Sequence, residues 1–394
     1  MTTGPMAPHH RRAIATVIVT TLVALALATG SLVAVFYKHL DANLKTGQAI
    51  KHLAKKKHTG PKDPLNILVM GIDTRSGAGN KIDNETGEGG SDTNILLHVS
   101  ADRKTAYGVS IPRDTLVDRP TCTTTSGKTI PGGTAQMWNK AYALGGPACT
   151  ARQLEAVSGI EIDGYLTVDF EGFKSMVDAI DGVQVCIPKP VNDQAHGIVF
   201  KAGTQTLKGQ QALNYVRERY STPNADIGRM KRQQAFISSM INKVVSAGTL
   251  TRPDRLIKFA SAAADSLTAS PGFDTVHDLT KLAGQLKHID LTHIRFVTVP
   301  SQPYDVPRSD PRWGRVELLP GAKNLWKRII DDKPLSKSLI SGSISAGAPP
   351  GSTSPSGTSS DTTSPSSPTG STSPSGQPSD TQAAQEAAAN GLCA

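Results

Sequence analysis

Basic residues gather in one short stretch of the sequence, residues 217–234 (RERYSTPNADIGRMKRQQ). The stretch holds five cations and two carboxylates within eighteen positions. Guanidinium groups remain charged at any relevant pH and bind phosphate oxygens through two parallel hydrogen bonds. Arg229, Arg232 and Gln233 are spaced so that they share one face of a helix. The stretch therefore indicates a site for a multiply charged anion such as pyrophosphate.

Structural roles also exist for these residues. Arg217 and Arg219 end a predicted helix, where cations interact favourably with the helix dipole. Asp226 is placed to cap the helix that follows, a role that does not exclude a functional one. Five cations so close together are still more than a solvated surface requires.

A predicted β-hairpin places another basic residue beside an acidic one. Residues 93–100 (TNILLHVS) and 105–111 (TAYGVSI) are two short strands joined by a turn. The arms of a hairpin are antiparallel, so residues just before the first arm and just after the second lie at the same edge of the sheet. We therefore expect Asp92 and Arg113 to be neighbours.

A further strand is predicted over residues 65–72 (LNILVMGI), whose continuous apolar run indicates burial on both faces. If it pairs parallel to the second arm of the hairpin, Asp73 and Arg75 reach the same edge, where α/β proteins commonly bind ligands. Two close aspartates favour a hard cation, with Mg²⁺ expected and Mn²⁺ an alternative. The other interpretation makes Asp92 a turn residue and Asp73 a surface charge.

Strand and helix patterns alternate along the chain, which predicts an α/β fold with a central mixed sheet covered by helices on both faces. The remaining strands are predicted over residues 163–170, 183–187 and 293–300, and the helices over 134–144, 148–158, 171–180, 207–219, 226–247, 254–266 and 274–288. The basic residues are not interleaved with aromatic ones, so no nucleic-acid partner is expected. His98, His196 and His293 are isolated and are interpreted as strand or surface residues.

An uncharged run of residues 13–36 is long enough to cross the hydrocarbon layer of a membrane as a helix. A cleaved signal peptide is the alternative, although so long a span is more often retained. The predicted organisation is a cytoplasmic tail (1–12), a transmembrane helix (13–36), a polar connector (37–63), one domain (64–335) and a disordered tail rich in Ser, Thr, Pro and Gly (336–394). The formal net charge of +9 favours anionic partners.

The cysteines bear on the compartment. Cys122 and Cys149 flank a Gly/Thr-rich loop and a short helix, which suits a disulfide formed after export. Basic residues near the span do not support a cytoplasmic N-terminus, so the export prediction depends on the cysteines and on the short N-terminal tail. Cys186 lies in an apolar run and is interpreted as a buried thiol, and Cys393 allows no interpretation.

At these same residues the sequence resembles the LytR-CpsA-Psr family of bacterial cell-wall proteins. Six blocks occur in the order typical of that family between about residues 65 and 245. They read NILVMGIDTR, SDTNILLHVS, VSIPRDTLV, YLTVDFEGFKSMVDAIDGVQV, LKGQQALNYVRER and DIGRMKRQQ. The resemblance implies an extracytoplasmic, Mg²⁺-assisted phosphotransferase. Such an enzyme moves a glycopolymer from a polyprenyl pyrophosphate carrier to peptidoglycan, usually onto the 6-hydroxyl of N-acetylmuramic acid.

Motif by motif, the resemblance assigns residue roles. Catalytic roles fall on Asp73, Asp92, Arg113 and Arg219, with Asp73 and Asp92 associated with the metal. The residues expected to bind pyrophosphate are Arg75, Arg113, Arg217, Arg219, Arg229, Arg232 and Gln233, with Asp226 matching the aspartate of the last block. The apolar tunnel for the lipid tail is expected to use Val168, Phe170, Phe173, Met176, Ile180, Leu213, Phe236 and Ile237.

The sequence also departs from the family pattern. Many actinobacterial relatives pair the cysteine at the position of Cys186 with one just before the TLKG block, and that partner is absent here. Cys186 is therefore expected to be unpaired. The alternatives to transfer are hydrolysis of the same carrier, a membrane-bound regulator and a noncatalytic anchor for wall polymer. The polymer itself stays open between teichoic acids, arabinogalactan and capsules.

Overall fold

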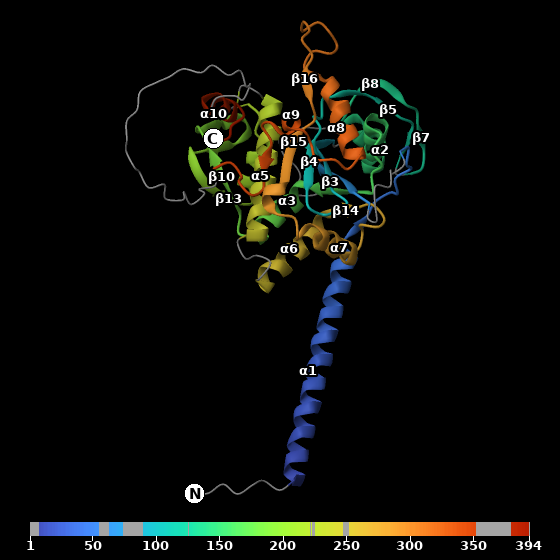
Figure 1. Ribbon diagram of the computed structural model, residues 1–394, viewed down its shortest axis with the longest axis vertical. Helices are drawn as coiled ribbons and strands as arrows, with labels where there is room; N and C mark the ends of the chain where they lie inside the picture. Colours follow the sequence, from blue (N-terminus) through green and yellow to red (C-terminus); the bar gives the residue numbers. More distant parts are fainter. Residues whose placement is uncertain are drawn as a thin grey trace, which may run out of the picture.

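The computed structural model describes residues 8–54, 63–73, 90–124, 126–220, 222, 225–246, 252–351 and 380–393. A long N-terminal helix, α1 (Pro8–Asn43), projects from a domain built on an eight-stranded sheet (Figure 1). From edge to edge the sheet runs β1 (Lys45–Thr46), β14 (Leu267–Ala269), β9 (Gly164–Asp169), β2 (Leu65–Ile72), β3 (Ser91–Val99), β4 (Ala106–Ser110), β15 (Ile294–Thr298) and β18 (Ile344–Ser345). Parallel and antiparallel pairs both occur, so the prediction of a mixed sheet is confirmed.

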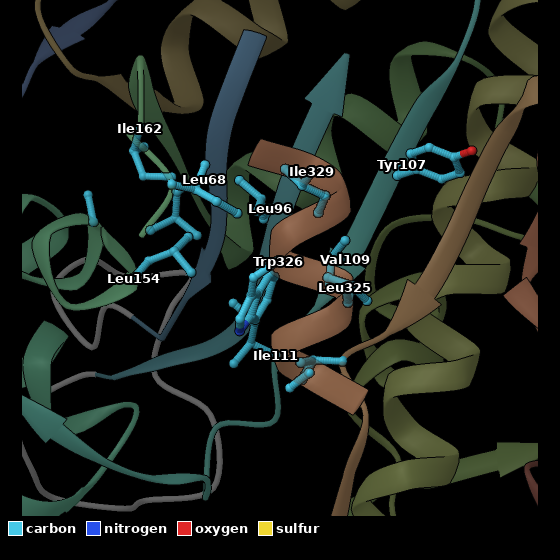
Figure 2. Close-up of a cluster of buried hydrophobic side chains, with 14 of the residues drawn as sticks. Leu68, Leu96, Tyr107, Val109, Ile111, Leu154, Ile162, Leu325, Trp326 and Ile329 are labelled. Carbon is cyan, nitrogen blue, oxygen red and sulfur yellow. The ribbon is translucent and has the colours of Figure 1, made fainter. Parts of the chain in front are cut away.

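Helices cover both faces of the sheet. One face packs against α2 (Lys140–Ser158) and α8 (Pro320–Ile330), and the other against α3 (Phe170–Ala179), α4 (Gly209–Arg217) and α5 (Ala225–Ser246). Leu68, Leu96 and Trp326 meet in the first of these cores (Figure 2). Ile67 and Leu68 are adjacent in β2 and both fully buried, as its continuous apolar run predicts.

Smaller elements complete the domain. Helices α6 (Pro253–Ser266) and α7 (Val276–Leu286) lie beside the end of α1 that meets the domain (Figure 1). Five short hairpins are formed by β5 (Leu116–Arg119) with β8 (Gly133–Met137), β6 (Cys122–Thr123) with β7 (Thr129–Ile130), β10 (Val183–Ile187) with β13 (Gly203–Leu207), β11 (Val191–Asp193) with β12 (Ile198–Phe200), and β16 (Ser301–Pro303) with β17 (Val316–Leu318).

One assumption about strand pairing is not met, and one helix prediction is partly wrong. Strand β2 pairs with β3 and β9, and not with β4. Because β2 and β4 are both antiparallel to β3, they still end at the same edge. The helix predicted over residues 134–144 begins only at Lys140, because residues 133–137 pair with β5 as strand β8. Helix α2 then continues to Ser158 through a kink at Gly146, which precedes Pro147 and has a φ of 68°.

The predicted polar connector belongs in large part to the domain. Helix α1 continues to Asn43, where Leu40 is buried, and β1 extends the central sheet by pairing with β14. The hydroxyl of Tyr165 then donates to the carbonyl of Gln48 at 2.6 Å. These contacts fix the chain that follows α1, so it is not a free spacer up to residue 54.

The C-terminal region extends the domain beyond the boundary predicted at residue 335. Helix α9 (Lys337–Ile340) and strand β18 follow that boundary, and α10 (Asp380–Ala389) leads to a disulfide between Cys186 and Cys393. The prediction that Cys186 is unpaired is therefore wrong, because its partner lies 207 residues away and not in the neighbouring hairpin. The prediction of disorder for residues 352–379 lies outside the described residues.

Candidate active site

A cavity of about 310 Å³ lies between the sheet and helices α3, α4 and α5. The change from polar to apolar lining in this cavity is clearest along helix α5. The cavity is lined there by Arg229, Gln233, Ile237 and Met240. These residues follow one face of the helix over about 16 Å, from charged to apolar. The cavity therefore has a polar end at the start of α5 and an apolar end further along that helix.

Ion pairs link the strand edge to α5 at the polar end. Arg113 donates from Nη1 to Oδ1 of Asp92 at 2.6 Å, so the two are neighbours, as the hairpin predicts. Its Nη2 lies 3.8 Å from Oδ1 of Asp226, and that same oxygen lies 2.7 Å from Nη2 of Arg229. Two carboxylates and two guanidiniums thus alternate in one series of ion pairs, of which Asp92, Arg113 and Arg229 line the cavity.

Burial and charge act in opposite directions on these arginines. Burial disfavours the charge of Arg113, but the carboxylates of Asp92, Asp114 and Asp226 outweigh it and raise its pKa. Burial, together with the nearby charge of Arg113, lowers the pKa of Arg229, whose side chain is 7% exposed. An incoming anion would relieve that mutual repulsion of the two guanidiniums, so the wall favours negatively charged ligands.

The segment after α4 adds two more arginines to the cavity lining. Arg217 stacks on the ring of Phe170, with its Cζ 5.0 Å from the ring centroid. Arg219 lies over the ring of Tyr220 at 4.7 Å and donates to its hydroxyl at 2.5 Å. Both guanidiniums are therefore held by flat aromatic surfaces.

Sequence reasoning missed part of this wall. His196 lines the cavity, stacks on Tyr220 with centroids 4.8 Å apart, and has its Nδ1 2.7 Å from Oδ2 of Asp193. Asp193 lies three residues before His196 and also lines the cavity. That spacing was the only available signal, because contact with Tyr220 depends on the fold.

The apolar part of the cavity receives most of the residues predicted for a lipid tunnel. Those that line it are Val168, Phe170, Phe173, Met176, Leu213 and Ile237. Ile180 and Phe236 do not line it, because both are fully buried in the core formed with the β10–β13 hairpin. The alternation of core and cavity positions along a helix cannot be read from hydrophobicity alone.

Arg232 is not part of the cavity, although it was expected to bind pyrophosphate. Its Nη2 lies 2.9 Å from Oε2 of Glu218, and the backbone carbonyls of Glu218 and Asn390 also accept from it. Burial lowers the pKa of Arg232, and the charge of Glu218 opposes that effect. Gln233 does line the cavity and donates to the carbonyl of Val216 at 3.0 Å. Arg75 lies outside the described residues.

The two predicted metal ligands lie on neighbouring strands. Asp73 and Asp92 both line the cavity, and the backbone N–H of Asp73 donates to the carbonyl of Gly90 at 3.1 Å. Among the residues that the structure describes, no group of three or more His, Cys, Asp or Glu side chains could hold an ion alone. Mg²⁺ commonly binds one or two carboxylates and completes its shell with water and substrate phosphate. The two carboxylates of the cavity fit that mode.

Fold and cavity together define an α/β protein with an N-terminal apolar helix and a pocket suited to an anionic amphiphile. The chain belongs to the LytR_cpsA_psr family, whose model matches residues 33–313. The cell wall biosynthesis protein LcpA of Corynebacterium glutamicum is 33% identical over 60% of this chain, and the match spans 49% of LcpA.

Other relatives carry a transferase name. The polyisoprenyl-teichoic acid–peptidoglycan teichoic acid transferase TagU of Enterococcus faecalis is 31% identical over 61% of this chain and 71% of its own length. The crystal structure of B. subtilis TagV has a TM-score of 0.54 and 25% identity, covering 70% of this chain and all of the crystallised TagV chain. A structure of TagT bound to LIIa-WTA has a TM-score of 0.51 and 22% identity, with 73% of this chain and 96% of TagT covered. At that identity, the TagT likeness shows the fold alone.

Proposed function

We propose that this protein is a membrane-anchored phosphotransferase that moves a glycopolymer from a polyprenyl pyrophosphate carrier to peptidoglycan. The observation that carries the proposal is the polarity of the cavity, with arginines and carboxylates at one end and apolar side chains at the other. A pyrophosphate on a polyprenyl chain has the same two-part chemistry. The names of the TagU and TagV relatives support transfer to peptidoglycan.

The arginines supply most of the proposed catalysis. The acceptor, the 6-hydroxyl of N-acetylmuramic acid, attacks the phosphorus that carries the glycopolymer and gives its proton to a carboxylate of the cavity, Asp73 or Asp92. The bond from that phosphorus to the bridging oxygen breaks, and polyprenyl phosphate leaves with the electron pair. Arg113, Arg219 and Arg229 stabilise the charge that develops on the phosphate oxygens, and one such fixed donor typically contributes about 3–4 kcal/mol to the transition state.

We also propose that Asp73 and Asp92 hold Mg²⁺ together with the pyrophosphate oxygens. The ion would add charge neutralisation at the bridging and non-bridging oxygens. Removal of divalent ions with EDTA should therefore abolish transfer, and Mg²⁺ or Mn²⁺ should restore it. The melting temperature without substrate should not change on EDTA treatment, because the carboxylates alone do not complete the site. Unchanged transfer in EDTA would exclude the metal.

The proposed location is the outer face of the membrane, with residues 1–12 in the cytoplasm. Among the described residues, one helix, Thr16–Asn43, is long and apolar enough to span a bilayer. Two disulfides, Cys122–Cys149 and Cys186–Cys393, favour an oxidising compartment. A reporter that is active only outside the cytoplasm, fused to the C-terminus, tests this orientation.

Labelled lipid-linked polymer and a peptidoglycan acceptor test the function. Transfer yields labelled peptidoglycan, hydrolysis yields free polymer, and a noncatalytic anchor yields neither. The double variant Arg113→Ala/Arg219→Ala should lose transfer and keep its melting temperature. Arg312→Ala is a matched control, because that guanidinium pairs with Asp310 away from the cavity. An active double variant would refute the arginine mechanism.

A further inference from the structure

We propose that the first turns of helix α6 contact the membrane surface, with anionic lipid headgroups as their partner, and that this contact places the apolar end of the cavity next to the lipid. The inference rests on the part of the proposed function that puts α1 in the membrane. It extends that proposal by assigning a second membrane contact, made by the domain itself.

The ends of α1 and α6 are fixed side by side and run in the same direction. Asn43 donates from Nδ2 to Oδ1 of Asp265 at 2.6 Å, and Leu40 is buried with Ala264 in one cluster. Phe36 and Ala260 pack on that cluster one turn nearer the start of each helix. In Figure 1, α6 leads away from this contact on the side of the domain from which α1 projects.

This register sets the height of α6 relative to a bilayer. The uncharged run of α1 ends at Phe36, seven positions before Asn43 and so roughly 10 Å below it at 1.5 Å per residue. On α6, Ile257 lies eight positions before Asp265, which is about 12 Å along the helix. The first turns of α6 therefore approach the level at which the apolar part of α1 ends, where headgroups meet the hydrocarbon.

The side chains at that level suit a lipid surface. Leu256 and Ile257 are 40% and 48% exposed, and Val245 at the end of α5 is 41% exposed. Arg252 and Lys258 flank the two apolar residues and are also exposed, and Asp254 offsets one of these charges. Exposed aliphatic side chains next to basic ones are typical of helices that lie in an anionic membrane interface.

Helix α6 also connects this surface with the cavity. Phe259, half a turn beyond Ile257, packs against the same core as Phe173 and Met240, which line the apolar part of the cavity. Pockets of roughly 300–1,000 Å³ enclose a drug-sized ligand, and this one measures about 310 Å³. A polyprenyl chain is longer, so part of it must stay outside. Contact between α6 and the membrane would keep that part in lipid.

Spin labelling of the full chain in nanodiscs tests the contact. The described cysteines are all in disulfides, so a nitroxide on Ile257→Cys would report one position. In nanodiscs containing phosphatidylglycerol, the label should collide with oxygen more than with a water-soluble nickel complex. A label on Lys323→Cys, exposed on α8, should show the reverse. A label at 257 as accessible to nickel as that at 323 would overturn the proposal.

Activity gives a second test if labelling disturbs the helix. Ile257→Asp should lower transfer from a full-length polyprenyl substrate in anionic nanodiscs about tenfold, because interfacial binding depends on buried apolar area. Transfer from a short-chain, water-soluble substrate should not change. Leu53→Asp is the matched control: it also alters an exposed aliphatic side chain, but in a segment bound to Glu155 of α2. Equal rates of transfer by Ile257→Asp and Leu53→Asp from the long substrate would contradict the α6 contact. A wild-type chain that is inactive on both substrates would instead contradict the proposed function.

Discussion

Arg229 and Arg232 lie one turn apart on α5, yet they belong to two different regions of the molecule. Arg229 lines the cavity, and its partner Asp226 is 45% exposed. Arg232 points into the protein and holds Glu218, whose side chain is only 3% exposed. Arg229 can leave Asp226 and bind a ligand, because the exposed carboxylate of Asp226 can be solvated by water. Arg232 cannot leave Glu218 in this way, since that would leave a buried charge unpaired.

The comparison teaches that the partner of an arginine decides whether the arginine can bind a ligand. The sequence contains both residues in one cluster with one spacing, and the same family motif covers both. We call Arg232, Glu218 and Asn390 the buried clasp, and the ion-paired residues Asp92, Arg113, Asp226 and Arg229 the cavity wall. Asp92, Arg113 and Arg229 line the cavity, and so does Glu218 of the clasp. Four groups of variants test whether the clasp acts on stability and the wall on activity.

The largest effect is expected in the buried clasp. Arg232→Ala should lower the free energy of unfolding by about 3–5 kcal/mol, because Glu218 loses its partner in a buried position. Urea denaturation measures the loss. The double variant Glu218→Gln/Arg232→Gln should recover part of it by removing both charges. An Arg232→Ala protein as stable as wild type would show that the buried clasp does not stabilise the folded state.

The next effect is expected in the cavity wall. Arg229→Ala should lower kcat/KM for transfer roughly 100- to 1,000-fold, as the loss of a positioned charge in an active site typically does. Its free energy of unfolding should change far less than that of Arg232→Ala, because Asp226 is already half exposed. If Arg229→Ala instead unfolds the protein and leaves the rate intact, the two regions have been assigned the wrong way round.

The third effect concerns the Cys186–Cys393 disulfide, which holds the C-terminal segment that contacts Arg232. Cys186→Ser/Cys393→Ser should lower the free energy of unfolding by about 2–4 kcal/mol. The bond closes a long loop and fixes the segment in which the carbonyl of Asn390 accepts from Arg232. The matched control is Cys122→Ser/Cys149→Ser, whose sequence separation is 27 and not 207. A larger loss in the control would contradict the role given to the C-terminal segment.

The smallest effect is expected at the edge of the wall. His196→Ala removes the imidazole that stacks on Tyr220, a contact of about 0.5–1.5 kcal/mol, and should raise KM a few-fold. His196→Phe keeps a flat ring and should recover most of the loss. A large fall in kcat that His196→Phe does not restore would indicate that His196 has a chemical role beyond support of Tyr220.

Local patterns predicted much of the fold and of the site. Asp92 and Arg113 could be paired from sequence, because a hairpin fixes which residues face each other across two short strands. Long helices such as α5 and strands such as β2 were also predicted, because their apolar patterns are continuous over many residues. Asp73 and Asp92 follow from the same reasoning about strand ends, and both line the cavity.

Features that depend on distant contacts were not predicted. The clasp requires that Arg232 turn toward Glu218, and spacing on α5 gives no sign of that rotation. Cys393 follows an Ala-rich segment, and its partner is far away in the sequence. Residues 133–137 form a strand only because β5 lies opposite them. In each case tertiary partners override the local preference.

The direct pairing of β1 with β14 limits how far the pocket can move relative to α1. A helix joined to its domain by a flexible linker would let the pocket sweep through a volume above the bilayer. Here α1 runs into the central sheet with only Leu44 between them. With α1 in the membrane, the pocket is held at a fixed distance from the bilayer. The proposed transfer would therefore reach only acceptors that lie near the membrane.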